Sequence, residues 1–316
     1  MSIDTTNETR IGPPTGDAAA TSVCGDGPPG SALRIAMQGS GRLTEPSLEL
    51  LRGIGLEFDE RERKLFARCR NLEVELLFLR DDDIPEYVQD GVADLGIVGG
   101  NVIREQGAEL TELKALGFGR CSLSLAVPEN SGLRHPAELT RRRIATTHPR
   151  SLRRYLDERG VDARIVRLRG AVEIAPALDV ADAVCDLVST GTTLRMHELR
   201  PIDVLWESEA TLVARPDAMD DGPRAALIRR LLVRMDGLLM ARRLKYVTLN
   251  APKSAMPRIR EILPGMRSPT VMPLAEEGMV AVHAAAEEDV FWEAMERLKA
   301  AGATEILVLP VEKVMR

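Results

Sequence analysis

Short apolar runs and apolar residues at helical spacing alternate along this chain from Leu33 onward. The runs are bounded by glycine and polar residues and predict strands at residues 33–38, 74–79, 93–100, 143–147, 164–168 and 183–188. Between them, the sequence predicts helices at 45–52, 151–159 and 172–178 and a further helix that ends at Gly91. Strands that alternate with helices are typical of an α/β fold, in which ligands lie at the carboxyl ends of parallel strands.

The strand pattern divides into two lobes. Residues 116–127 predict a crossover out of a first lobe, and strands at 204–207 and 210–215 are expected to return the chain to it. We therefore assign residues 32–118 and 196–223 to lobe I and residues 119–195 to lobe II. Two α/β lobes with a double crossover and a cleft between them resemble the type II periplasmic-binding architecture.

The last third of the chain has a different pattern. Residues 224–243 have apolar side chains at helical spacing and predict an amphipathic linker helix: Leu227, Leu231, Met235 and Leu238. Strands at 246–249, 270–274, 279–284 and 305–309 follow, with helices at 252–263 and 289–300. The order βαββαβ is that of a ferredoxin-like unit, a common plan of small-molecule regulatory domains of the ACT type. We assign residues 224–316 to the linker helix and an ACT-like regulatory domain.

Composition narrows the classes of protein. Residues 1–31 are rich in threonine, glycine, proline and alanine without periodic apolar positions, and they predict a disordered tail rather than a secretory signal. The net charge of -6 argues against a general nucleic-acid binder. No apolar run approaches the roughly 18 residues of a membrane span. The cysteines lie far apart in the sequence, which is typical of a protein of the reducing cytoplasm.

A candidate anion-binding loop follows the strand at 183–188. It consists of five small residues before a helix expected to begin near Leu194: Ser189, Thr190, Gly191, Thr192 and Thr193. The amides of a first helical turn have no intrahelical partner and, with hydroxyl groups and a glycine, suit a phosphate. Asp182 and Asp186 stand just before the loop, where carboxylates can bind sugar hydroxyls or a phosphate-bound metal. An ordinary capped helix is the alternative, and the two carboxylates favour a phosphorylated ribose.

A second candidate site follows the strand at 33–38. The residues Gly39-Ser40-Gly41-Arg42 form a turn before a helix, and Arg42 adds a charge that can bind a phosphate through two nitrogens. Further along, the three aspartates at 81–83 are expected to cap the next helix, with a metal site as the alternative.

Several motifs together resemble a known family. Asp186-Leu-Val-Ser-Thr-Gly-Thr is similar to the phosphoribosyl-pyrophosphate loop of phosphoribosyltransferases. A longer series, in order along the chain, resembles ATP phosphoribosyltransferase, the first enzyme of histidine biosynthesis. The series comprises Arg34-Ile-Ala-Met-Gln, Arg80-Asp-Asp-Asp-Ile-Pro, Asp94-Leu-Gly-Ile-Val-Gly, Arg143-Ile-Ala-Thr, Ser189-Thr-Gly-Thr-Thr-Leu, Ser268-Pro-Thr and Ile306-Leu-Val-Leu-Pro-Val-Glu-Lys. The third domain resembles the long form of this enzyme, which implies a hexamer built from dimers, inhibition by histidine, and Mg²⁺ bound with the substrates.

The resemblance also implies a reaction. N1 of the ATP adenine joins C1 of the ribose of phosphoribosyl pyrophosphate, and pyrophosphate leaves. Residues 189–194 are then expected to bind the 5-phosphate, and Asp182 and Asp186 the ribose hydroxyls, with Asp186 also a candidate Mg²⁺ ligand. Gly41, Arg42 and Asp94 are the expected ATP-binding residues.

Two further residues complete the expected sites. Glu173, with Arg42, is a candidate catalytic residue, because a carboxylate can stabilise the positive charge that develops on the ribose; an exposed helix residue is the alternative. Thr270 is the candidate contact for histidine, and a plain threonine at a strand edge is its alternative.

One position departs from the family pattern. The family commonly has a lysine where this chain has Gly39, so one expected cation is missing beside Arg42. A competing function is that of a two-lobed solute-binding protein for a phosphorylated ligand. The hydroxyl-rich loop, the third domain and the lack of a secretory signal favour the enzyme.

Overall fold

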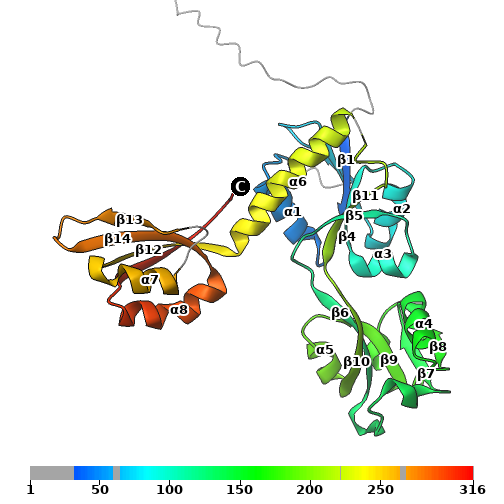
Figure 1. The fold of residues 1–316 in the computed structure, drawn as a ribbon. Coiled ribbons are helices and arrows are strands. Elements are labelled where there is room, and N and C mark those ends of the chain that lie inside the picture. The colour runs from blue at the N-terminus through cyan, green and yellow to red at the C-terminus, as the bar shows by residue number, and fades with distance from the viewer. Residues whose placement is uncertain (1–31, 60–64, 221, 264–267, 316) are drawn as a thin grey trace, which may run out of the picture.

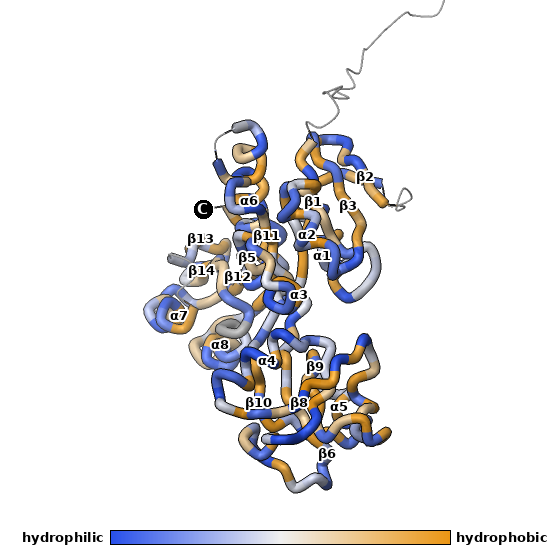
Figure 2. The backbone as a smooth tube through the Cα atoms, turned by 90° about the vertical axis from the view of Figure 1, so that its right-hand side faces the viewer, coloured by the Kyte–Doolittle hydropathy of each residue, from blue (hydrophilic) through white to orange (hydrophobic). Residues whose placement is uncertain are grey.

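The computed structural model describes residues 32–59, 65–220, 222–263 and 268–315. Figure 1 shows three sheet-containing units, with lobe I joined to lobe II below it and to a separate C-terminal domain through the long helix α6. The predicted tail at residues 1–31 lies outside the described residues. Figure 2 shows that hydrophobic stretches of the chain run through the sheets, while hydrophilic residues occupy much of the connecting turns.

Lobe I contains a six-stranded sheet in the order β2-β3-β1-β4-β11-β5. Its strands are β1 (Leu33–Gln38), β2 (Phe66–Arg68), β3 (Val74–Leu79), β4 (Leu95–Gly99), β5 (Thr111–Ala115) and β11 (Ala210–Ala214), and its helices are α1 (Thr44–Gly53), the 3-10 turn η2 (Asp81–Asp83), α2 (Ile84–Gln89) and α3 (Gly100–Gln106). β1 lies parallel to both β3 and β4, so the carboxyl ends of these three strands share one edge. Ligand-binding turns are expected at that edge.

Lobe II contains a five-stranded sheet in the order β10-β6-β9-β7-β8. Its strands are β6 (Cys121–Pro128), β7 (Arg143–Thr146), β8 (Arg164–Arg167), β9 (Ala183–Val188) and β10 (Leu199–Ser208), and its helices are α4 (Pro149–Glu158), α5 (Thr192–Met196) and the 3-10 turns η3 (Glu129–Ser131), η4 (Pro136–Leu139) and η5 (Val172–Ile174). β9 has the bounds that the sequence predicts, and its first three residues, 183–185, are fully buried.

Two expectations about lobe II are wrong. The strand at 204–207 does not return to lobe I, because β10 pairs antiparallel with β6 along its whole length. The chain re-enters lobe I only at β11, so residues 199–208 belong to lobe II. The helix expected at 172–178 is only the 3-10 turn η5. Pro176 has no N–H to donate to the carbonyl of Val172, and that carbonyl accepts a bond from Ala175 at 3.1 Å instead.

The C-terminal domain has the predicted βαββαβ order. It comprises β12 (Leu244–Pro252), the 3-10 turn η6 (Lys253–Ala255), α7 (Met256–Ile262), β13 (Thr270–Pro273), β14 (Met279–Glu287), α8 (Glu288–Ala300) and β15 (Thr304–Pro310). The sheet order is β13-β14-β12-β15 with every neighbouring pair antiparallel, as in a ferredoxin-like fold. Both α7 and α8 lie on one face of this sheet (Figure 1).

Helix α6 (Pro223–Arg242) is more than a linker. Ile228, Leu231 and Met235 are fully buried in the core of lobe I, in one cluster with Leu48 and Leu51 of α1. The amphipathic pattern predicted this helix, but its apolar residues pack against lobe I rather than against the C-terminal domain. By packing, α6 belongs to lobe I, and the C-terminal domain begins at β12. Within the described residues, no helix is long and apolar enough to cross a membrane.

Candidate active site

The two turns that the sequence singles out meet between the lobes. The guanidinium of Arg42, in the turn after β1, donates a hydrogen bond of 2.5 Å to Oγ of Ser189, in the loop after β9. These residues lie 147 positions apart and on different lobes. We call residues 39–42 the lobe I turn and residues 189–193 the lobe II loop. The fold therefore brings a cation of lobe I into contact with a hydroxyl-rich loop of lobe II.

The lobe I turn depends on glycine. Gly41 has a φ of +137°, and a Cβ there would lie 2.6 Å from the side chain of Gln38. Gln38 occupies that space because its side-chain oxygen accepts the amide of Leu43 at 3.1 Å. The hydroxyl of Thr44 also donates to the carbonyl of Gln38, at 3.2 Å. These bonds fix the turn and leave Arg42 exposed toward the cleft.

The lobe II loop also contains a glycine in the left-handed region. Gly191 has a φ of +72°, and the nearest atom to a Cβ there would be a nitrogen of Arg195 at 3.5 Å. Glycine therefore suits this position because of its backbone conformation, and not because a side chain would lack room. The hydroxyls of Thr190 and Thr192 lie 3.1 Å apart. Helix α5 begins at Thr192, two residues before the expected start, and Leu194 is buried in the lobe II core, so only its backbone can face a ligand.

Two carboxylates lie beside the lobe II loop. Asp186, near the end of β9, has a raised pKa, first because it is largely buried and then because of the negative charge of Glu173, while the charge of Arg42 opposes the shift. Glu173 and Arg42 therefore each lie within electrostatic range of Asp186. Glu173 is half-buried at the η5 turn, so it is not the exposed helix residue of the alternative interpretation.

Asp182 does not belong to this group, although the sequence predicted a sugar contact for it. It precedes β9 and therefore lies at the amino end of the strand, about six residues, or roughly 20 Å, from the lobe II loop. Its carboxylate accepts the amide of Arg143 at 2.7 Å and the guanidinium of Arg143 at 3.3 Å. These bonds hold the pKa of Asp182 below its usual value, the Arg143 side chain being the largest cause.

Asp94 has the corresponding position in lobe I, so the predicted ATP contact is also wrong. It precedes β4, and its carboxylate accepts the amide of Arg34 at 2.8 Å and a guanidinium nitrogen of Arg224 at 3.2 Å. Each lobe thus uses an Ala-Asp pair before a central strand to hold the start of the neighbouring parallel strand. Both aspartates stabilise the sheets at the edge away from the cleft.

The aspartates after β3 do not cap the helices that follow. Neither η2 nor α2 has a hydrogen bond from the side chain of its N-cap residue, so the predicted role is wrong. Asp81 instead has a raised pKa because of burial, with Asp82 raising it further and Arg42 lowering it. One of its carboxylate oxygens is buried without a hydrogen-bond partner. Asp81 therefore adds negative charge on the lobe I side of Arg42.

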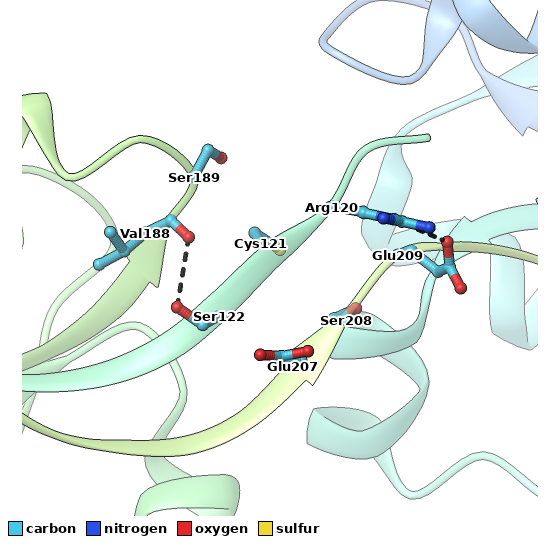
Figure 3. Close-up of a pocket in the computed structure, with 8 residues that line it drawn as sticks. All are labelled: Arg120, Cys121, Ser122, Val188, Ser189, Glu207, Ser208 and Glu209. Carbon is cyan, nitrogen blue, oxygen red and sulfur yellow. Dashed lines mark hydrogen bonds and ion pairs between the residues drawn. The ribbon is translucent and has the colours of Figure 1, made fainter. Parts of the chain in front are cut away.

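A pocket of about 560 Å³ lies where the chain crosses between the lobes. Figure 3 shows its lining residues, which come from the start of β6, the end of β9 and the end of β10: Arg120, Cys121, Ser122, Val188, Ser189, Glu207, Ser208 and Glu209. Arg120 and Glu209, one from each crossover, form an ion pair at 3.5 Å. Of the predicted site residues only Ser189 lines this pocket. The sequence pattern does not single out Arg120 or Glu209, and the available signal is a charged residue at each point where the chain passes between the lobes.

The residues present fit a metal only when a substrate supplies further ligands. Among the described residues, no group of three or more histidine, cysteine, aspartate or glutamate side chains could hold a metal ion. Mg²⁺ commonly binds one or two carboxylates together with substrate phosphates and waters. Asp186, with Glu173 near it, meets that requirement on the protein side.

Comparison with known proteins decides the family. The family model for ATP phosphoribosyltransferase (HisG) matches residues 80–237, and that for the C-terminal domain of HisG matches residues 241–313. The chain belongs to the ATP phosphoribosyltransferase family. A solved ATP phosphoribosyltransferase complex (HisG:HisZ) from Thermotoga maritima is 27% identical in sequence and has a TM-score of 0.56. The match covers 65% of this chain and 98% of the Thermotoga chain. The alkanesulfonate-binding protein SsuA from Xanthomonas axonopodis pv. citri, solved with MOPS, is 21% identical over 66% of this chain and 74% of its own, with a TM-score of 0.42.

The family match confirms the predicted activity. The chain is a phosphoribosyltransferase of histidine biosynthesis, and the C-terminal match makes it the long form with a regulatory domain. The fold is similar to that of the solved Thermotoga maritima enzyme complex, and the third domain matches a part of the enzyme rather than of a transport protein. The solute-binding alternative is therefore excluded.

Proposed function

We propose that ATP and phosphoribosyl pyrophosphate react between the lobes, where the lobe I turn meets the lobe II loop. The contact between Arg42 and Ser189 supports this placement, because it brings together the cation and the hydroxyl-rich loop that the family motif provides. Transfer of a phosphoribosyl group needs both kinds of group within one site. It also needs a cleft from which water can be excluded.

The lobe II loop is proposed to bind the 5-phosphate of the ribose. The backbone amides of residues 190–194 and the hydroxyls of Ser189, Thr190, Thr192 and Thr193 supply the donors. Gly191 holds the left-handed conformation that turns these groups to one side. Arg195, in the first turns of α5, donates to the hydroxyl of Thr192 at 3.4 Å and adds a positive charge at the same loop.

Asp186 is proposed to bind the ribose hydroxyls and, with the pyrophosphate oxygens, to hold Mg²⁺. The metal would neutralise part of the charge of the departing pyrophosphate. The raised pKa of Asp186 follows from its burial, and a bound cation would favour its ionised form. Asp182 has no part in this site, because Arg143 occupies its carboxylate.

The reaction is proposed to be a direct displacement. The lone pair of adenine N1 forms the bond to ribose C1 while the bond from C1 to the pyrophosphate oxygen breaks, and that oxygen keeps the electron pair. No protein nucleophile takes part. Glu173 lies beside Asp186 and would stabilise positive charge on the ribose ring, while Arg42 and the backbone of Gly41 would contact phosphates from the lobe I side.

Regulation is proposed to reside in the C-terminal domain. Histidine is the expected inhibitor, with Thr270 as one contact. Thr270 is exposed on the edge strand β13, directly opposite His283 of β14, so its hydroxyl is accessible to a ligand. We propose a cytoplasmic enzyme that assembles from dimers into a hexamer. The exposed sheet residues Tyr246, Met272 and Leu307 leave apolar surface for contacts between subunits.

Pyrophosphate release from ATP and phosphoribosyl pyrophosphate tests the proposal. Arg42→Ala should lower kcat/KM for both substrates by about tenfold or more, because a charge-assisted phosphate contact is worth roughly 1.5–3 kcal/mol. Arg154→Ala is a matched control, since Arg154 is exposed on α4 and away from the loop. Ser189→Ala should raise KM for phosphoribosyl pyrophosphate. Wild-type constants in both Arg42→Ala and Ser189→Ala would exclude this placement of the site.

A further inference from the structure

A second contact joins the lobes through their helices. Glu105, near the end of α3 in lobe I, accepts hydrogen bonds from the backbone amides of Arg150 and Ser151 in lobe II, each at 2.9 Å. Both amides belong to the first turn of α4. In Figure 1, α3 and α4 face each other to the right of strands β6 and β10, whereas α1 and α5 lie to the left of these strands. The lobes are thus connected on both sides of the crossover.

Helix α4 has no cap from its own lobe. Its N-cap residue, His148, makes no side-chain capping bond, and Pro149 at the first helical position has no N–H. The next two amides have no partner within the helix and must be satisfied from outside. The carboxylate of Glu105 satisfies both and places a negative charge at the positive end of the helix. Lobe I therefore supplies the N-terminal cap of a lobe II helix.

Neighbouring residues reinforce the contact. The guanidinium of Arg150 donates to the carbonyl of Gln106 at 2.5 Å. Arg104, one residue before Glu105, lies over the ring of Trp206 in lobe II at 5.4 Å from its centroid. His148 meets the same ring edge-on at 6.4 Å. Arg104, Glu105 and Gln106, three consecutive residues of α3, thus contact lobe II, and separation of the lobes would break their contacts together. The contact between His148 and Trp206 lies within lobe II and would remain.

We propose that Glu105 is a positioning residue of the phosphoribosyl transfer: by capping α4 across the cleft, it holds the lobes at the separation where Arg42 reaches Ser189. This role rests on the proposed placement of the reaction between the lobes. Opening the cleft would exchange the two bonds from Glu105 to α4 for bonds to water and would remove the negative charge from the helix terminus, which disfavours the open state. A ligand that binds across the cleft benefits from the preformed arrangement, since its apparent affinity scales with the population of the competent conformation.

The expected effect separates KM from kcat. Without the cap the open conformation gains population, and KM for both substrates should rise by about threefold to tenfold in Glu105→Ala. Once both substrates are bound, the same groups surround the ribose, so kcat should change by less than about twofold. Glu105→Gln keeps an oxygen acceptor but loses the charge, so its KM values should lie between those of the wild type and Glu105→Ala.

The experiment combines kinetics with amide hydrogen exchange on the full-length protein. Exchange at Arg150 and Ser151 should accelerate in Glu105→Ala and less in Glu105→Gln, while the core strands β7 and β9 keep wild-type protection. Glu86→Ala, which removes an exposed carboxylate of α2, is the control and should leave both readouts unchanged.

Two results would overturn the proposal. Unchanged exchange at Arg150 and Ser151 in Glu105→Ala would show that Glu105 does not cap α4. Faster exchange with wild-type KM values would show that the cap does not position the lobes. The exchange measurement does not depend on where the reaction occurs, whereas failure of the Arg42 and Ser189 variants to affect turnover would contradict the proposed site whatever Glu105 does.

Discussion

Replacing Asp182 distinguishes a structural role from a role in binding the ribose. The structure predicts that Asp182→Ala weakens folding and leaves the substrate constants unchanged in the folded enzyme. Three bonds are lost: one to the backbone amide of Arg143 at 2.7 Å and two to its guanidinium at 3.3 Å each. The guanidinium keeps a second partner, because it also donates to the carboxylate of Asp179 at 2.7 Å.

The magnitude follows from these contacts. A hydrogen bond to a charged group contributes roughly 1.5–3 kcal/mol, and an exposed ion pair adds at most about 1 kcal/mol because water screens it. The Asp182 side chain is 25% exposed, and Arg143 is not left without a partner. We therefore expect Asp182→Ala to lower the free energy of unfolding by about 1–2 kcal/mol. Asp182→Asn, which keeps an oxygen for the backbone amide, should lose about half of that.

The stability difference should depend on pH. The folded-state pKa of Asp182 is lowered, first by the Arg143 side chain, so its contribution is present above the unfolded-state pKa of about 3.9. The contribution is lost as the pH falls through the folded-state value. Urea unfolding of wild type and Asp182→Ala at neutral pH and at stepwise lower pH should therefore show a gap that narrows below about pH 4. A raised KM for phosphoribosyl pyrophosphate with an unchanged unfolding free energy would refute this reasoning.

Three further changes test the loop, the turn and the third domain. Gly191→Val should lower kcat/KM by about fivefold to thirtyfold and Gly191→Asn by less, because a β-branched residue in the left-handed region costs roughly 1–2 kcal/mol and asparagine tolerates it. Equal loss in both would point to crowding instead. Gly39→Lys should tighten ATP binding, measured by calorimetry, because it adds the cation that is missing beside Arg42. The position can accept a side chain, since Gly39 does not have a positive φ and a Cβ there would meet Phe78 at 3.3 Å, a contact that a small shift relieves. Unchanged affinity in the folded variant would contradict the missing-cation argument. A protein ending at Arg242 should lose histidine binding by calorimetry, and retained binding would place the effector site in the catalytic lobes.

The sequence predicted the local elements of the site better than their partners. The bounds of β9 and the glycine of the lobe II loop could be read directly, because both depend on neighbours in the chain. Asp182 is close to the loop in sequence but not in space, because it precedes β9 and therefore lies at the end of the strand opposite the loop that follows it. The same argument applies to Asp94. Two Ala-Asp pairs in equivalent positions were an available signal for a shared structural role.

The hydrophobic pattern of the sequence could not predict which residues make contacts between the lobes. Glu105 lies 45 positions from Arg150, and the helix that it caps carries no capping residue of its own, so nothing local indicates the pair. The lining of the interlobe pocket could not be predicted for the same reason, since Arg120 and Glu209 come from two crossovers and lie 89 residues apart in the chain. Such pairs follow from tertiary packing, which a periodicity argument does not contain.

Helix α6 determines how the third domain can influence the cleft. Three consecutive residues contact different parts of the molecule: Asp236 pairs with Lys114 of β5, the carbonyl of Gly237 accepts the amide of Val314 at 3.1 Å, and Leu238 fills the space beside Gly53 of α1. A Cβ on Gly237 would lie 2.5 Å from the carbonyl oxygen of Val314, so the glycine permits this close approach.

The C-terminal domain is therefore attached to lobe I at both of its ends. Its first strand, β12, continues from α6, and the segment after β15 returns to α6 at Gly237. A domain held at two points cannot turn freely about a single linker, so a movement of its sheet must act on α6. Because α6 packs against α1, and α1 begins two residues after Arg42, such a movement reaches the lobe I turn through packed side chains. This arrangement also explains why a truncation meant to isolate the catalytic lobes has to keep α6: cutting near residue 221 would remove Ile228, Leu231 and Met235 from the lobe I core.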